Sequence, residues 1–418
     1  MSSVTKFREL VQLVKDHDSF EKLYGRMREN FKKASSTSPP RKKQQSARDA
    51  GQIKLFGLDC EMIITTDEDG GGDKEYSLAR ASLVEFLPEV EEFHTRFDVF
   101  VKVPEERAVK DLLEHVSGVS EQHLQTASHT LDDVISLLEH HVSHHDILVG
   151  HSLWSDFEAL KWWHDNFVDT SLFFSVAPAP RMTLGLKDAV IHAVGEMFQT
   201  GGAHDPVADA KYALKVAKFL ADRPGGPFVE LEDVPDRFKK TLTIVNLDAS
   251  RGDINDILEK IAVDCKATIP KPMKVTTRNG VDYGSITFEF ENEQAAVQAL
   301  QSFPANTEVN GDGGYLDQSG FLKKACAFKQ FTPVILCEVI SYHRVSLDGE
   351  IEWTCQRKRL GKLLGQKGER VLRIQRMTGA QISNKPKDDK HVVFTIRASD
   401  RDKCEAALKL LKDENETI

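Results

Sequence analysis

The most constraining feature of this 418-residue chain is an apolar, strand-like run from Leu55 to Ile63 that contains Asp59 and Glu61. Side chains two residues apart in a strand point to the same face, so the two carboxylates emerge side by side. Burying unpaired charge is costly, so such a pair binds a metal ion, pairs with a basic side chain or shares a proton. A strand end that reaches water would also explain the pair, and the rest of the chain must decide.

Two further acidic positions follow on separate elements. Residues 147–160 predict a buried strand, a turn and an amphipathic helix that begins close to Asp156. Residues 201–220 predict a second helix, because two glycines are followed by Asp205 in the N-cap position, Pro206 as the first helical residue and an apolar stripe. We therefore interpret Asp205 as a helix cap.

Asp209 lies one turn inside this second helix, and His204 lies just before it. Together with Asp59, Glu61 and Asp156 they place four carboxylates and one imidazole on three elements of a single domain. Such a set is typical of a two-metal site that cleaves phosphodiester bonds, because carboxylate oxygens suit divalent cations and imidazole titrates near neutral pH.

Three sequence strings lie in order within residues 53–222: DCEM, VGHSLWSDFEAL and HDPVADA. They resemble the three exonuclease motifs of the DEDD superfamily, and the spacing from His204 to Asp209 resembles its histidine subclass. DCEM followed by LARASLV is similar to the eukaryotic RNA exonucleases, which include small-RNA-degrading nucleases. Each motif alone is weak evidence, but three in order within one domain-sized span are much stronger.

This resemblance implies an α/β domain with an RNase H-like mixed sheet and 3′→5′ exonuclease activity that releases nucleoside 5′-monophosphates. It assigns two Mg²⁺ ions, with Mn²⁺ as a substitute, to the four carboxylates of Asp59, Glu61, Asp156 and Asp209. It makes His204 the general base toward water and places Met62 against the terminal nucleotide, although a plain core methionine is an equal alternative. Cys60 alternates to the other face of the strand, so we interpret it as a core residue.

The chain departs from the family pattern at residues 65–77, an acidic and glycine-rich insertion where a hairpin tip is expected. We interpret it as a solvated loop in preference to a regulatory metal or partner site.

The sequence predicts four regions. Residues 1–50 combine helical periodicity with a polar linker whose basic residues 41–43 could serve nuclear import, contact RNA or simply be solvated. Residues 51–225 form the exonuclease domain. Two α+β domains follow: an RRM-like domain at residues 238–330 and a KH-like domain at residues 348–418.

Residues 242–247 and 283–290 resemble the two ribonucleoprotein strand motifs of an RNA-recognition domain, within a strand and helix order of the ferredoxin-like type. Where that family stacks bases on aromatic rings, this chain carries Thr243, Ser285 and Thr287. We therefore expect a degenerate RNA-recognition fold, which either packs against its neighbours or holds RNA.

Residues 350–382 and the strand and helix after them resemble a KH domain, whose G-x-x-G loop would be Gly365, Gln366, Lys367 and Gly368. Glycines let the backbone approach phosphates closely, and the following helix N-terminus favours anions. Basic residues crowd this region, as expected for a phosphate-binding surface: Arg357, Lys358, Arg359, Lys362, Lys367, Arg370, Arg373 and Arg376.

Composition limits the remaining classes. The net charge of −10 argues against a protein that coats nucleic acid over its whole surface. The six cysteines form no C-x-x-C pair, which argues against a structural zinc or a disulfide framework. We expect no membrane segment and no signal peptide, and hence an intracellular protein, either nuclear, including nucleolar, or cytoplasmic.

The sequence thus predicts a metal-dependent 3′→5′ exoribonuclease that trims or degrades single-stranded 3′ ends of small or non-coding RNA. A DNA 3′→5′ exonuclease would carry the same five site residues. A non-catalytic RNA-binding adaptor is the other alternative, and the complete carboxylate set argues against it.

Overall fold

The computed structural model describes residues 2–37, 52–67, 75–177, 182–199, 203–270, 273–278, 281–306, 315–316, 321–331, 334–344, 349–365 and 368–417. The chain divides into two compact units, one made of residues 1–177 with 181–231 and the other of residues 178–180 with 232–418. Among the described residues, no helix combines the length and the apolar character that crossing a bilayer requires.

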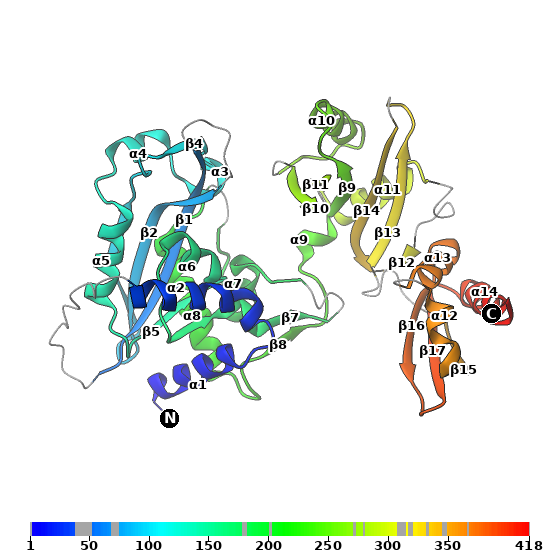
Figure 1. Cartoon of the computed structure of the whole chain (residues 1–418), viewed down its shortest axis with the longest axis horizontal. Helices are drawn as coiled ribbons and strands as arrows, with labels where there is room; N and C mark the ends of the chain where they lie inside the picture. The colour runs from blue at the N-terminus through cyan, green and yellow to red at the C-terminus, as the bar shows by residue number, and fades with distance from the viewer. Residues whose placement is uncertain are drawn as a thin grey trace. The chain divides into compact units, whose positions relative to one another are not determined.

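A mixed sheet forms the centre of the first unit, and Figure 1 labels its strands β1, β2, β4 and β5. The strands lie in the order β3-β2-β1-β5-β6, and β4 pairs with β1. Strands β1 to β3 are antiparallel, whereas β5 and β6 run parallel to β1. The predicted mixed α/β sheet is therefore confirmed. Its strands are β1 (Leu55–Asp67), β2 (Glu75–Leu87), β3 (Glu92–Phe100), β4 (Arg107–Asp111), β5 (Ile147–Gly150) and β6 (Phe167–Asp169).

Helices and a small parallel strand pair complete this unit. The long helix α8 packs against β1, β2 and β5 through a face of small and apolar side chains, which brings its axis close to the sheet. The elements are α3 (Glu114–Ser117), α4 (Glu121–Thr126), α5 (Leu131–His141), α6 (Trp154–Leu160), η2 (Thr170–Phe173), β7 (Phe174–Val176), α7 (Leu186–Val194), α8 (Pro206–Asp222) and β8 (Val229–Leu231).

The N-terminal segment folds as α1 (Ser3–Lys15), a π-helical turn η1 (Glu21–Gly25) and α2 (Arg26–Thr37). Helix α1 is amphipathic, and its apolar face contacts α8 and β6. That face buries Phe7, Leu10, Val11 and Val14. The sequence analysis places residues 1–50 outside the exonuclease domain. The apolar face of α1 nevertheless packs into the hydrophobic core of that domain.

The second unit contains a six-stranded antiparallel sheet in the order β10-β11-β9-β14-β13-β12. Its strands alternate apolar side chains toward a core shared with α10 and α11. Strand β14 pairs with β9, so the sheet continues beyond residue 330, where the sequence places the end of the domain. The elements are α9 (Asp236–Lys239), β9 (Thr241–Asp248), α10 (Ile254–Asp264), β10 (Lys274–Arg278), β11 (Val281–Glu289), α11 (Glu293–Ser302), β12 (Tyr315–Leu316), β13 (Phe321–Phe328) and β14 (Ile335–Arg344).

A three-stranded sheet in the order β15-β17-β16 forms the C-terminal part, with a hydrophobic core of its own. Helices α13 and α14 contact each other, and α14 also packs against β15 and β17. The elements are β15 (Gly349–Gln356), η3 (Arg357–Arg359), α12 (Leu360–Leu364), α13 (Glu369–Thr378), β16 (Gln381–Pro386), β17 (His391–Ala398) and α14 (Arg401–Thr417).

Candidate active site

Strand β1 supplies the first two carboxylates of the candidate site. Asp59 and Glu61 lie two residues apart, as the alternation of a strand requires, and Glu61 pairs in register with Arg80 of β2. The Glu61 side chain is 6% exposed. A bulge follows Glu61, because the pairing with β2 shifts by one residue before Met62. Met62 is half-buried, which is compatible with either interpretation made from the sequence.

Helix α6 supplies Asp156 in its first turn, as predicted. Asp156 is 4% exposed, and its carboxylate lies close to the backbone N–H and the thiol of Cys60. Burial raises the pKa of this carboxyl, while the two groups of Cys60 lower it. Cys60 is buried as expected, but its thiol lies beside this acidic side chain as well as apolar ones. Asp156 therefore lies close to the strand that carries Asp59.

Helix α8 supplies Asp209, and the close approach of α8 to β1 has a specific cause. A Cβ added to Gly57 would lie 2.4 Å from the carbonyl oxygen of Ala210 and 2.9 Å from the Leu214 side chain. Any other residue at position 57 would therefore push the helix away from the strand. Glycine at this position brings Asp209 next to the acidic end of β1.

Asp205 is not the side-chain cap that the sequence suggested. It occupies the N-cap position before Pro206, but its side chain makes no capping hydrogen bond. Its carboxylate instead pairs with Arg80 at 3.2 Å, and Arg80 also pairs with Asp98 at 2.7 Å. This long-range ion pair ties the segment before α8 to β2, and local sequence rules could not anticipate it.

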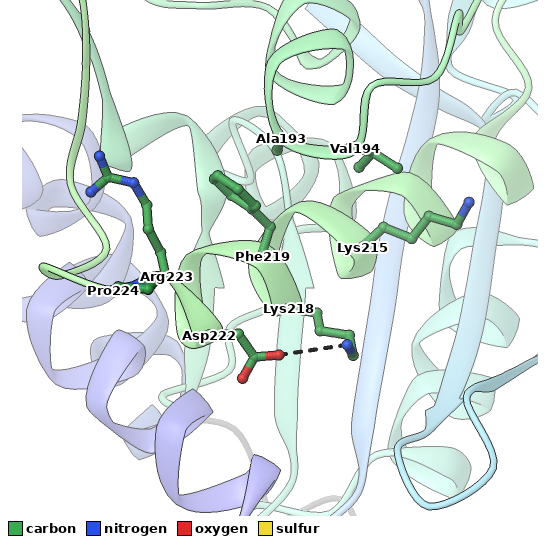
Figure 2. Close-up of a pocket in the computed structure, with 8 residues that line it drawn as sticks. All are labelled: Ala193, Val194, Lys215, Lys218, Phe219, Asp222, Arg223 and Pro224. Carbon is green, nitrogen blue, oxygen red and sulfur yellow. Dashed lines mark ion pairs between the residues drawn. The ribbon is translucent and has the colours of Figure 1, made fainter.

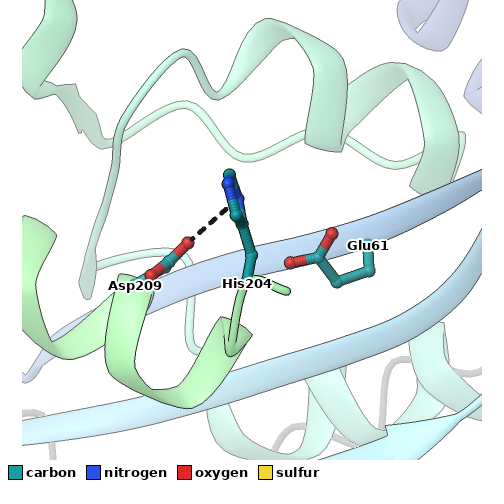
Figure 3. Close-up of side chains that lie close together, drawn as sticks. All are labelled: Glu61, His204 and Asp209. Carbon is teal, nitrogen blue, oxygen red and sulfur yellow. Dashed lines mark ion pairs between the residues drawn. The ribbon is translucent and has the colours of Figure 1, made fainter. Parts of the chain in front are cut away.

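Glu61, His204 and Asp209 form the tightest group of the candidate site (Figure 3). One ligand atom from each lies within 4.8 Å of the other two, and His204 Nδ1 is 3.6 Å from Asp209 Oδ2. The His204 side chain is 41% exposed, so it faces water on one side and buried carboxylates on the other. Its backbone N–H donates to the carbonyl of Val116 at 2.8 Å, which anchors the segment that carries it.

Asp59 and Asp156 lie near this group without belonging to it. Asp156 is close enough for its negative charge to raise the pKa of both Asp59 and Glu61, and Asp209 and Glu61 also raise the pKa of Asp59. The structure therefore gathers all five sequence-predicted residues in one region, with three of them in the closest arrangement.

Burial is the largest cause that raises the pKa of each carboxyl in this region. It raises the pKa of Glu61 to about 8, and the charges of Asp209 and Asp156 add to the rise while Arg80 opposes it. The pKa values of Asp156 and Asp209 rise to about 7. Asp59 rises well above its ordinary value, first through burial and then through repulsion by its neighbours.

The donor set fits a hard divalent cation. Mg²⁺ and Mn²⁺ prefer oxygen ligands, and Glu61, Asp156 and Asp209 are buried. Acidic neighbours repel the carboxylates of Asp59 and Glu61. Arg80 lowers the pKa of Glu61, but its guanidinium is already engaged by Asp98 and Asp205. A cation among these oxygens would relieve the repulsion that their pKa values record.

Sequence reasoning missed Gln199, which holds Asp209 directly. The side-chain nitrogen of Gln199 lies 2.9 Å and 3.1 Å from the two carboxylate oxygens of Asp209. The backbone of Gln199 adopts a positive φ of 50°, and its carbonyl accepts a hydrogen bond from Lys187 at 2.8 Å. A positive φ at a non-glycine residue beside functional groups indicates in a structure that the residue has a functional role. No local sequence signal marks Gln199 as such a residue.

The two glycines of the G-x-x-G loop follow α12 and precede α13 in the chain. Gly365 and Gly368 have φ values of 72° and 78°, which favour glycine. Gln366 and Lys367 lie outside the described residues. Part of the acidic insertion, residues 68–74, lies outside them as well.

A cavity of about 460 Å³ opens along the C-terminal half of α8 (Figure 2). None of the sequence-predicted site residues lines it. Its two lysines are paired, Lys215 with Glu196 at 3.0 Å and Lys218 with Glu91 at 3.1 Å. Arg223 donates to the carbonyls of Gly226 and Phe228. The lining residues are Ala193, Val194, Lys215, Lys218, Phe219, Asp222, Arg223 and Pro224.

Comparison with known proteins shows similarity to RNA exonucleases over about two fifths of the chain. An uncharacterized exonuclease of Schizosaccharomyces pombe is 32% identical over 167 residues, which are 40% of this chain and 24% of that protein. RNA exonuclease 1 of Saccharomyces cerevisiae is 32% identical over 171 residues, covering 40% and 28%. Small RNA degrading nuclease 3 of Arabidopsis thaliana is 28% identical over 179 residues, covering 42% and 21%.

The chain therefore matches about a quarter of the length of these relatives. Separately, the family model of the KH domain matches residues 350–413. The resemblance to RNA exonucleases and the C-terminal KH domain are thus both shown.

The raised pKa values predict how stability depends on pH without metal. The folded carboxyls of Glu61, Asp156 and Asp209 keep their protons up to about pH 7 or 8, whereas unfolded ones lose them near pH 4. We expect the melting temperature in EDTA to fall as the pH rises through this window, because the folded state binds more protons there. Divalent cations require the deprotonated ligands, so the Mg²⁺- or Mn²⁺-induced rise in melting temperature should grow from pH 5 to pH 8.

Asp59→Asn is the matched variant for this measurement. It removes one of the repelling charges, so it should raise the melting temperature in EDTA and shrink the metal-induced shift. A wild-type melting temperature that changes neither with pH nor with added metal would contradict a clustered acidic site.

Proposed function

We propose that this protein is a metal-dependent 3′→5′ exoribonuclease that shortens single-stranded ends of small or non-coding RNA and releases nucleoside 5′-monophosphates. The convergence of Glu61, His204 and Asp209 within 4.8 Å carries the proposal. It lies in a chain that is similar to RNA exonucleases over about 170 residues.

The chain's own residues take distinct parts in this reaction. Asp59, Glu61, Asp156 and Asp209 hold two Mg²⁺ ions, for which Mn²⁺ can substitute. When bound, such ions stabilise the attacking and leaving oxygens of an in-line displacement at phosphorus. His204 accepts the proton of the attacking water, since its imidazole reaches both solvent and the carboxylates. Met62, beside the bulge of β1, packs against the terminal nucleotide.

The KH domain provides a second contact for longer RNA. Gly365 and Gly368 let the backbone approach phosphates, and α13 begins directly after the loop. Two of the basic residues on α13, Arg370 and Arg373, pair with Glu414 of α14, so they are partly neutralised. Because these two arginines are partly neutralised, we assign the RNA contact to the loop residues Gln366 and Lys367.

The six-stranded sheet is a degenerate RNA-recognition fold with an added β12–β13 edge. On the face away from α10 and α11, Thr243 and Thr287 lie opposite each other and their hydroxyls are 3.2 Å apart. The short polar side chains at these two positions offer no platform on which bases could stack. The sheet therefore either packs against neighbouring parts of the chain or holds RNA without stacking bases on these two positions.

A degradation assay tests the proposal. The full chain is incubated with RNA and DNA oligomers labelled at the 3′ or the 5′ end, with Mg²⁺ or with EDTA. We expect stepwise shortening of RNA from the 3′ end in Mg²⁺ only. Preferred shortening of DNA would favour the DNA exonuclease, and binding of RNA without shortening would favour the adaptor.

A nuclear location is also part of the proposal, and imaging of the tagged protein tests it.

Replacement of both Gln366 and Lys367 by aspartate should separate short from long substrates. An exonuclease site holds only the last few nucleotides, whereas a tethered second contact raises the effective concentration of long RNA. We expect kcat/KM for an RNA of roughly 20 nucleotides to fall at least about tenfold, since avidity contributes roughly 10² or more. The salt slope of binding should fall by about one, and a trimer should be degraded as before.

The control is Lys403→Asp, at an exposed position at the start of α14, which adds negative charge to the same domain outside the G-x-x-G sequence. Equal slowing of both substrates by the loop variant, or no slowing of either, would contradict an RNA contact at the KH domain.

A further inference from the structure

Tyr24 is a buried polar side chain in the N-terminal segment, far in sequence from the candidate site. It belongs to the π-helical turn η1 and is 0% exposed. Its ring packs against Phe167 of β6, with centroids 4.8 Å apart, and edge-on against Phe157 of α6 at 6.3 Å. Phe157 is the residue directly after Asp156.

The Tyr24 hydroxyl donates a hydrogen bond to Asp169 Oδ2 at 2.5 Å, and it lies close to the backbone N–H of Trp154, the first residue of α6. Burial and the charge of Asp169 raise the pKa of Tyr24 well above its ordinary value, so the hydroxyl remains a donor. One side chain therefore connects β6 to the helix that carries Asp156.

Asp169 is itself fully buried and organises the turn before α6. Its Oδ1 accepts from the backbone N–H of Ser152 at 2.7 Å, and from the N–H and hydroxyl of Ser171 at 2.9 Å and 2.7 Å. Ser152 has a φ of 64°, which costs energy for a non-glycine residue unless its surroundings hold it. The Asp169 carboxylate provides that hold.

The turn continues to Asp156. The carbonyl of Ser152 accepts from the Ser155 hydroxyl at 2.9 Å, and the same hydroxyl lies 3.5 Å from Asp156 Oδ2. Each link from Tyr24 to Asp156 is thus a buried or partly buried contact with a defined partner.

We propose that Tyr24 is a positioning residue of the site. Through Asp169 and the first turn of α6 it orients the Asp156 carboxylate. The N-terminal segment, which carries Tyr24, thereby contributes to the function of the exonuclease domain. The inference rests on the proposed function, in which Asp156 is a metal ligand. Groups that orient a metal ligand typically change metal affinity or activity by roughly 10- to 100-fold when they are removed.

Tyr24→Phe tests the proposal, because it removes only the hydroxyl and keeps the ring. Mn²⁺ binding to the full chain is measured by isothermal titration calorimetry without RNA, and kcat and KM are measured for a trimer RNA. We expect the Mn²⁺ dissociation constant to rise about tenfold and kcat at fixed metal to fall, with little change in KM. Ser155→Ala, which removes a link of the same chain without leaving a buried carboxylate unpaired, should act in the same direction.

The control is Tyr212→Phe, which removes a tyrosine–carboxylate bond of 2.6 Å to Glu196 on the surface of the same unit. It should leave Mn²⁺ binding unchanged. Wild-type Mn²⁺ affinity in Tyr24→Phe, or an equal loss in Tyr212→Phe, would overturn the proposal, and Ser155→Ala decides it if Tyr24→Phe fails to fold. Wild-type protein that neither binds Mn²⁺ nor degrades RNA would instead overturn the proposed function.

Discussion

Asp209→Asn should abolish metal-dependent shortening of RNA, with a fall in kcat/KM of about 10³-fold or more. A catalytic metal supplies several kcal/mol of charge stabilisation in the transition state, and each 1.4 kcal/mol is a factor of ten. The Asp209 carboxylate lies in the tightest group of the site, and both of its oxygens accept from Gln199. An amide at this position removes a negative ligand and turns one acceptor into a donor that faces the Gln199 amide.

The matched control is Asp222→Asn, in the last turn of the same helix. Asp222 pairs with Lys6 and Lys218 on the surface and lies away from the acidic cluster. Rates are compared over a Mg²⁺ titration, because a variant that merely binds metal more weakly would recover at high concentration. Near-wild-type turnover in Asp209→Asn, or an equal loss in Asp222→Asn, would contradict the assignment of the site.

Short-range patterns made this region predictable. The alternation of β1 sets Asp59 and Glu61 on one face, and Pro206 fixes where α8 begins. Both depend on neighbours within a few residues, which a single sequence displays directly. The approach of α8 to β1 depends on Gly57, whose importance shows only when its partner Ala210 is known.

The contacts that hold the site residues in place could not be predicted, because they join residues far apart in the sequence. Arg80 meets Asp205 across 125 residues, and Tyr24 meets Asp169 across 145. Such contacts have no periodicity and no fixed spacing, because the fold and not the local chain brings the partners together. Asp205 shows the consequence, since local rules assigned it to capping while tertiary structure gave its carboxylate to Arg80.

The end of the six-stranded sheet illustrates a similar limit. A ferredoxin-like pattern accounts for β9, α10, β11 and α11, but the partner of β9 is the later strand β14. Strands β13 and β14 are similar in composition, so composition does not show which of them pairs with β9. That choice depends on long-range pairing. The KH region was easier, because its positive-φ glycines and the apolar positions beside them lie close together in sequence, between Leu363 and Ile382.

His204→Ala should slow turnover by roughly 10² to 10⁴ while metal binding persists, which is the usual share of a general base. The imidazole is exposed on one side, and its Nδ1 lies 3.6 Å from Asp209. The same position would also let it act as a metal ligand, since its ligand atom lies within the group formed with Glu61. Turnover and Mn²⁺ affinity must therefore be measured on the same variant.

Added imidazole separates the two roles of His204. A free base can enter the space left by the side chain and accept the proton, so we expect imidazole to restore part of the rate of His204→Ala at constant metal. His192→Ala, on an exposed position of α7, should neither lose activity nor respond. If His204→Ala instead weakens Mn²⁺ binding at least as much as it slows turnover, and imidazole restores nothing, then His204 holds the metal and the attacking water must lose its proton to another group.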